Sequence, residues 1–152
     1  MRTKFLTTFF ATAALFAFSS FALAQRNVTP ALDPVLEADA KRNLDVARQG
    51  FGPGKQAYKQ VLLRFEETYA AYPEFTGIGE FLYMAGMSSY YLSENKGKQK
   101  VNLKSEREKE RYDPERLRTE AVAYLSIVID KYPEVKEIAT AKRTLELLKS
   151  SK

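Results

Sequence analysis

Residues 61–73 read VLLRFEETYAAYP and residues 121–133 read AVAYLSIVIDKYP, and these two stretches decide the fold. They share one spacing, Val61-x3-Phe65-x2-Thr68-x4-Pro73 in the first and Ala121-x3-Leu125-x2-Val128-x4-Pro133 in the second. Apolar residues three and four positions apart indicate a helix. Proline cannot extend a helix and restricts the residue before it. The spacing therefore predicts two helices that end in the same way, as in a repeated helical unit.

Outward from these stretches, the same periodicity predicts five helices, over residues 33–48, 55–71, 77–92, 113–131 and 135–149. Asp33-Pro34 and Asp113-Pro114 each place an N-cap residue before a proline at the first helical position. We expect Leu36 and Tyr69 among the inward-facing residues. No stretch alternates apolar and polar residues as a half-buried strand does, so the predicted fold class is all-α.

The segments YAAYPEF (residues 69–75), FLYMAGMSSYYL (81–92) and AVAYLSIVIDKYPE (121–134) together resemble a known family. They are similar to the tetratricopeptide (TPR) part of BamD-like proteins, which serve outer-membrane β-barrel assembly in the periplasm, and to the repeats of CpoB/YbgF proteins. The resemblance covers about residues 55–149 and implies a TPR-like stack of about five helices within residues 33–152. The two prolines are sixty positions apart, against a repeat period of about 34, and a charged insertion at residues 93–112 supplies most of the difference. The chain lacks the lipidated cysteine of BamD and holds roughly two repeats.

The N-terminal residues 1–24 have the order of a secretory signal peptide. Arg2 and Lys4 precede an apolar run at residues 9–18, and Ala22-Leu23-Ala24 gives a small-x-small cleavage site. An uncleaved anchor is the alternative, but the run is shorter than the ~20 residues that span a membrane. We expect cleavage after Ala24, a flexible N-terminus at residues 25–32, and a periplasmic location.

The chain contains no histidine and no cysteine, which removes the usual general base, thiol nucleophile and soft-metal ligands. Glu66 and Glu67 are adjacent on a predicted helix and point in different directions. Residues 106–110 alternate acidic with basic side chains, as a solvated surface does. Residues 50–54 lack the glycine spacing of a phosphate loop and instead predict a helix break. We therefore expect no enzyme, no cofactor and no metal.

Four lysines without an intervening acidic residue, Lys96, Lys98, Lys100 and Lys104, stand in the insertion. Residues 95–118 hold nine basic and five acidic side chains, so this part carries the positive charge of the domain. The lysines could contact anionic lipid headgroups or an acidic partner. The alternative is a solvated, mobile loop. Nucleic acid is not expected, because no aromatic residues that could stack on bases lie between the lysines.

Tyr83, Tyr90 and Tyr91 lie on the helix that, by the resemblance, lines the concave face of a TPR stack. Tyrosine combines apolar area with a hydroxyl group, which suits peptide binding. Core packing explains at least one of the three, because Tyr90 and Tyr91 are adjacent and cannot both face inward.

The predicted function is a periplasmic adaptor that binds another envelope or periplasmic protein, in cell-envelope or outer-membrane protein assembly. Two alternatives stay open. One is a structural subunit that forms homo-oligomers within an envelope complex. The other is peripheral contact with an anionic membrane surface through the lysine-rich loop.

Overall fold

The structure is a computed structural model that describes residues 33–150. This part of the chain is all-helical, as predicted, and has no strand. Its helices are α1 (Pro34–Phe51), α2 (Tyr58–Ala71), α3 (Ile78–Ser93), α4 (Glu106–Arg111), α5 (Pro114–Lys131) and α6 (Ile138–Ser150). The predicted signal peptide at residues 1–24 and N-terminus at residues 25–32 lie outside the described residues. Between residues 33 and 150, no helix has the length and apolar character needed to cross a membrane.

The two predicted N-caps are confirmed. Asp33 Oδ1 accepts hydrogen bonds from the backbone N–H groups of Val35 at 2.8 Å and Leu36 at 3.3 Å. Asp113 Oδ2 accepts from the N–H of Arg116 at 3.0 Å. These bonds satisfy donors that a first helical turn otherwise leaves unpaired, and so they fix where α1 and α5 begin.

The predicted break between the first two helices is displaced. α1 runs through Gly50 and ends at Phe51, and α2 begins at Tyr58 rather than near residue 55. Gly50 is buried within α1 and does not break the helix. The chain leaves the helix at Gly52, just before Pro53. Gln56 has a φ of 45°, which α-helix does not allow, and this delays the start of α2.

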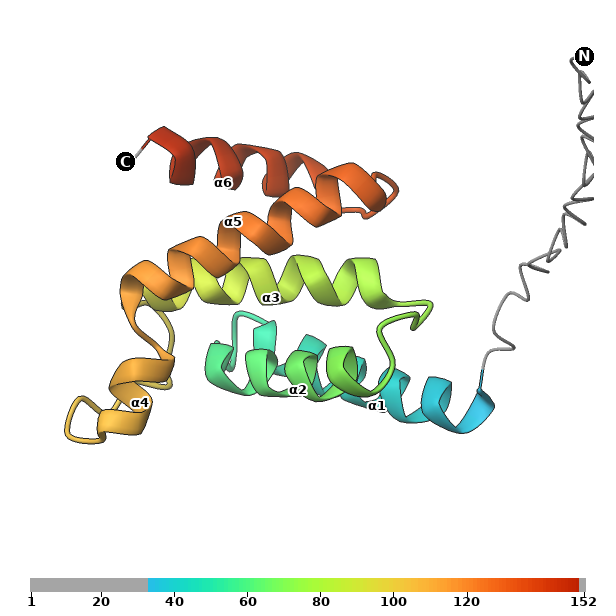
Figure 1. The fold of residues 1–152 in the computed structure, drawn as a ribbon, viewed down its shortest axis with the longest axis horizontal. Helices are drawn as coiled ribbons and strands as arrows, with labels where there is room; N and C mark the ends of the chain where they lie inside the picture. The colour runs from blue at the N-terminus through green and yellow to red at the C-terminus, as the bar shows by residue number, and fades with distance from the viewer. Residues whose placement is uncertain (1–32, 151–152) are drawn as a thin grey trace, which may run out of the picture. The chain divides into compact units, whose positions relative to one another are not determined.

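The helices stack in chain order, apart from the short α4 (Figure 1). α1 packs on α2, α2 on α3, α3 on α5, and α5 on α6, while α1 and α6 also touch α3. α3 is the central helix, and 13 of its 16 residues are buried. The α3–α5 contact is the most extensive, although the insertion separates these two helices along the chain.

The two turns that follow the repeated stretches have the same hydrogen bonds. Tyr72 N donates to Thr68 O at 2.7 Å, and Tyr132 N donates to Val128 O at 2.9 Å. In the first turn, Phe75 N then donates to Tyr72 O and Ile78 N to Phe75 O. The second turn repeats these bonds sixty positions later, from Val135 N to Tyr132 O and from Ile138 N to Val135 O. The shared spacing in the sequence therefore corresponds to a shared backbone geometry.

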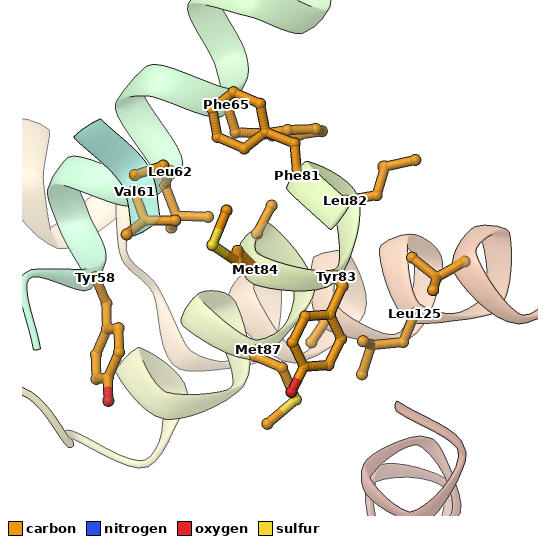
Figure 2. Packing of buried hydrophobic residues seen from close by; sticks show 14 of the residues in the cluster. Tyr58, Val61, Leu62, Phe65, Phe81, Leu82, Tyr83, Met84, Met87 and Leu125 are labelled. Atoms are coloured by element: carbon orange, nitrogen blue, oxygen red, sulfur yellow. The ribbon is translucent and has the colours of Figure 1, made fainter. Parts of the chain in front are cut away.

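The core lies between α2, α3 and α5, with contributions from α1 and α6 (Figure 2). Small residues let the helices approach closely. A Cβ added at Gly86 of α3 would lie 2.9 Å from Leu125 Cγ of α5. Ala121, also on α5, is fully buried. The missing Cβ of Gly86 is therefore what allows α3 and α5 to approach at this point.

Two residues expected to face inward do not. Leu36 is 37% exposed and Tyr69 is 43% exposed. Thr68 is buried in place of Tyr69, and its Oγ1 accepts a hydrogen bond from Asn43 Nδ2 at 3.2 Å. The Tyr69 ring stacks on Phe65 with centroids 5.3 Å apart, so it covers the core from outside.

Two adjacent serines in α3 are fully buried, and neither Ser88 Oγ nor Ser89 Oγ has a hydrogen-bond partner among residues 33–150. A buried hydroxyl without a partner costs about 1–3 kcal/mol. Ser88→Ala is therefore expected to raise the free energy of unfolding, by about 1 kcal/mol, in urea titrations followed by circular dichroism. Ser93→Ala is the matched control, because Ser93 Oγ donates to Tyr90 O at 2.8 Å, and it should lower stability. A loss of stability in Ser88→Ala as large as that in Ser93→Ala would contradict the prediction.

Candidate functional site

A small pocket opens beside the central helix. It has a volume of about 190 Å³, and residues of α1, of α3 and of the turn before α6 line it. The lining residues are Arg48, Phe51, Gly52, Glu80, Tyr83, Met84 and Glu137. We call this hollow the α1–α3 pocket. Its wall combines apolar side chains with charged ones, as pockets that bind a partner's side chain do.

Ion pairs hold one side of the α1–α3 pocket in place. Arg48 Nε and Nη2 donate to the two carboxylate oxygens of Glu80 at 2.7 and 2.6 Å. Arg48 Nη1 donates to Asp45 at 2.7 Å. The hydrogen bonds that Arg48 donates to Glu80 raise the pKa of the Arg48 guanidinium above its ordinary value. A bidentate ion pair of this kind fixes the orientation of both side chains. Arg48 of α1 and Glu80 of α3 therefore form a charged rim with a defined geometry.

Two aromatic residues, Phe51 and Tyr83, line the α1–α3 pocket. The Phe51 ring lies with its centroid 6.2 Å from that of Tyr83, 5.9 Å from Tyr58 and 6.3 Å from Tyr91. Tyr83 is only 6% exposed, and burial raises the pKa of its hydroxyl to about 12. This hydroxyl is therefore neutral at physiological pH and can both donate and accept a hydrogen bond. Figure 2 shows the Tyr83 ring on α3.

The structure separates the three tyrosines proposed from the sequence. Tyr83 lines the α1–α3 pocket, whereas Tyr91 does not. The ring centroid of Tyr91 lies 4.9 Å from that of Tyr58. Tyr90 instead lines another hollow, of about 140 Å³, with residues of α5 and α6. Tyr90 and Tyr91 are each half-buried, and their ring centroids are 5.5 Å apart.

The four lysines of the insertion differ in what their side chains contact. Lys98 Nζ donates to Gly54 O at 2.6 Å, and Lys100 Nζ donates to Asn95 O at 3.0 Å. Lys96 Nζ lies 5.5 Å from the centroid of the Tyr90 ring. The side chain of Lys104 makes no hydrogen bond or ion pair within residues 33–150, and Lys104 is exposed. Three of the four ammonium groups therefore have a partner within the chain: two donate to backbone carbonyls and one lies over an aromatic ring.

The insertion packs onto the start of α2. Lys98 N donates to Gln56 O at 3.1 Å. Gly97 has a φ of 101°, and a Cβ there would lie 2.7 Å from Tyr58 Cδ2, so only glycine fits. The insertion also contains α4, a short helix where the sequence predicted only a charged insertion. Ser105 caps this helix by accepting from Glu108 N at 3.4 Å.

Several of the acidic residues considered for catalysis are paired with basic ones. Glu66 pairs with Arg111, and Glu67 with Arg64 at 2.7 Å. Glu108 pairs with Lys59 at 2.8 Å, and this hydrogen bond lowers the pKa of the carboxyl group. Across residues 33–150, no group of three metal-ligating side chains is close enough to hold an ion.

Sequence reasoning missed Arg48, Phe51, Glu80 and Glu137 as pocket residues. Arg48 and Glu80 are 32 positions apart, and their pairing depends on how α1 packs beside α3. The sequence gives no local pattern for such a pair. Comparisons of the chain with protein-family models, with curated proteins and with solved structures gave no match.

Proposed function

We propose that this protein is a short TPR-like adaptor that binds a segment of another protein in the α1–α3 pocket, and that it acts in the periplasm in envelope assembly. One observation carries the proposal: a pocket with aromatic and charged walls lies where α1, α3 and the start of α6 meet. In a TPR-like assignment, these are the first helices of successive pairs, which line the binding face. The two identical turns and the α1–α3 and α3–α6 contacts support that assignment.

Binding would work by anchoring. An apolar side chain of the partner segment would rest against Phe51 and Met84, while the Tyr83 hydroxyl and the rim formed by Arg48 and Glu80 would bond its backbone or polar groups. The rim is held by ion pairs before binding, so little side-chain entropy would be lost on association. We propose binding rather than catalysis, because Glu66, Glu67 and Glu108 are engaged in ion pairs and the chain contains no histidine or cysteine. The periplasmic location rests on the order of residues 1–24.

The test is capture of a partner from periplasmic extract, followed by titration of the purified partner against two variants. Phe51→Ser removes the aromatic wall of the pocket, and truncation of such an anchor weakens binding by about 30-fold or more. Tyr69→Ser is the matched control, because Tyr69 is an exposed aromatic residue outside the pocket. Circular dichroism checks that both variants keep their helices.

We expect the partner to bind wild type and Tyr69→Ser with equal affinity, and Phe51→Ser far more weakly. If Phe51→Ser binds as well as wild type, the α1–α3 pocket is not the binding site. If both variants lose binding equally, the partner contacts a broader surface than the pocket.

A further inference from the structure

A second hollow, larger than the α1–α3 pocket, lies between α2 and the insertion. It has a volume of about 670 Å³ and is bounded by α2 on one side and by the insertion on the other. We call it the α2–α4 cleft. Its lining residues are Lys59, Gln60, Leu63, Arg64, Gln99, Ser105, Arg107, Glu108, Arg111 and Tyr112. Four of these are basic and one is acidic, so the cleft presents positive charge to an entering ligand.

The two walls of the α2–α4 cleft are tied together at both ends. Lys59 Nζ of α2 donates to Glu108 Oε2 of α4 and, at 3.2 Å, to Lys100 O. Glu108 Oε2 also accepts from Asn102 N at 2.8 Å. At the other end, Arg111 of α4 pairs with Glu66 of α2. The cleft is therefore formed before any ligand arrives, which lowers the entropic cost of binding.

Two arginines in the cleft have donors without acceptors. The side chain of Arg107 makes no hydrogen bond or ion pair within residues 33–150 and lines both the α2–α4 cleft and an adjoining hollow of about 310 Å³. Arg64 uses Nη1 to pair with Glu67, while its Nε is buried and lacks a partner among the described residues. A buried N–H without an acceptor is unfavourable, so an anion at Arg64 would satisfy a donor that the fold leaves open.

We propose that the α2–α4 cleft binds a phosphate group, with Arg107 and Arg64 as its principal donors. These donors come from opposite walls, Arg64 from α2 and Arg107 from α4. A tetrahedral phosphate accepts hydrogen bonds from several directions, whereas a planar carboxylate pairs with one guanidinium in one plane.

This site differs from the lysine set proposed from the sequence. Lys96, Lys98, Lys100 and Lys104 lie in the same insertion but do not line the α2–α4 cleft. Most of their ammonium groups are engaged within the chain. The proposed phosphate site therefore uses arginines of α2 and α4 that do not belong to the lysine set.

The test is isothermal titration of the purified protein with inorganic pyrophosphate. We expect saturable one-to-one binding to wild type, weakened about tenfold or more by Arg107→Gln and by Arg64→Gln, because each removes a charge-assisted donor. Lys104→Gln is the matched control, since it removes one positive charge from the same insertion outside the cleft. It should leave the affinity unchanged, and circular dichroism should show that all three variants keep their helices.

A second arm identifies the source of the phosphate. Flotation with phosphatidylglycerol vesicles, and with phosphatidylcholine vesicles as reference, reports headgroup binding. If the protein binds pyrophosphate and also floats on phosphatidylglycerol in an Arg107-dependent way, the site is assigned to a lipid headgroup. If it binds pyrophosphate but does not float, the site is assigned to a free phosphate compound. The proposal is overturned if wild type shows no saturable pyrophosphate binding. It is equally overturned if Lys104→Gln weakens binding as much as Arg107→Gln.

Discussion

Replacing Phe65 by alanine is expected to lower the free energy of unfolding by about 3–5 kcal/mol, the usual cost of removing a buried aromatic ring. Phe65 is 1% exposed and stands where three helices meet. Its ring contacts Phe81 of α3 at 5.6 Å and Tyr124 of α5 at 5.0 Å, both edge to face. Loss of the ring would open a cavity against both helices at once. Domains of this size have about 5–15 kcal/mol of stability, so the variant should unfold at much lower urea concentration.

Leu63→Ala is the control for this measurement. Leu63 lies on the same helix, two residues earlier, and is 41% exposed. Because its side chain is only partly removed from water, we expect a loss below about 1 kcal/mol. Equal losses in the two variants would show that Phe65 is not at the centre of the packing between α2, α3 and α5.

The helices were predictable because their determinants are local. A cap and a proline fix where α1 and α5 begin, and the Tyr-Pro turns fix where α2 and α5 end. α4 was not predictable from periodicity, because its sequence EREKER contains no apolar residue to form a stripe. Its signal was the cap: Ser105 stands three residues before Glu108, and the side chain of Ser105 accepts from the backbone of Glu108.

The surfaces were less predictable than the helices, because they depend on pairs of residues far apart in the sequence. A run of lysines shows where positive charge is concentrated in the sequence. It does not show which ammonium groups form hydrogen bonds within the fold, such as the one that Lys98 donates to Gly54 O. Conversely, the positive character of the α2–α4 cleft arises only when α4 folds back on α2, so that Arg107 and Arg64 line the same cleft. Tyr83 was singled out because tyrosine is favourable both in a core and on a binding face, and in the structure it is buried and lines the α1–α3 pocket.

The insertion does not prevent α3 and α5 from packing together. The insertion begins after the C-terminal end of α3 and ends at Asp113, the N-cap of α5. Among the described helices, α3 and α5 make the most extensive contact. The insertion itself makes its contacts with α2 and with the turn before it, through Lys59, Gln56 and Gly54. The chain therefore carries the cleft as an addition to one side of the stack, separate from the α1–α3 pocket.

Substitution of Ala121 by leucine is expected to lower the free energy of unfolding by about 1–3 kcal/mol, because added methylene groups in a filled core force neighbours to move. Ala121 is fully buried on α5, the helix whose Leu125 fills the space left by the missing Cβ of Gly86. Ala123→Leu is the control, because Ala123 is two residues away on the same helix and exposed. The same added volume there should change stability by no more than about 0.5 kcal/mol. Thermal unfolding of the two variants, followed by circular dichroism, separates the positions. A melting temperature unchanged by Ala121→Leu would mean that α5 can rotate or shift along α3, and the register that aligns Ala121 with Val61 would then be wrong.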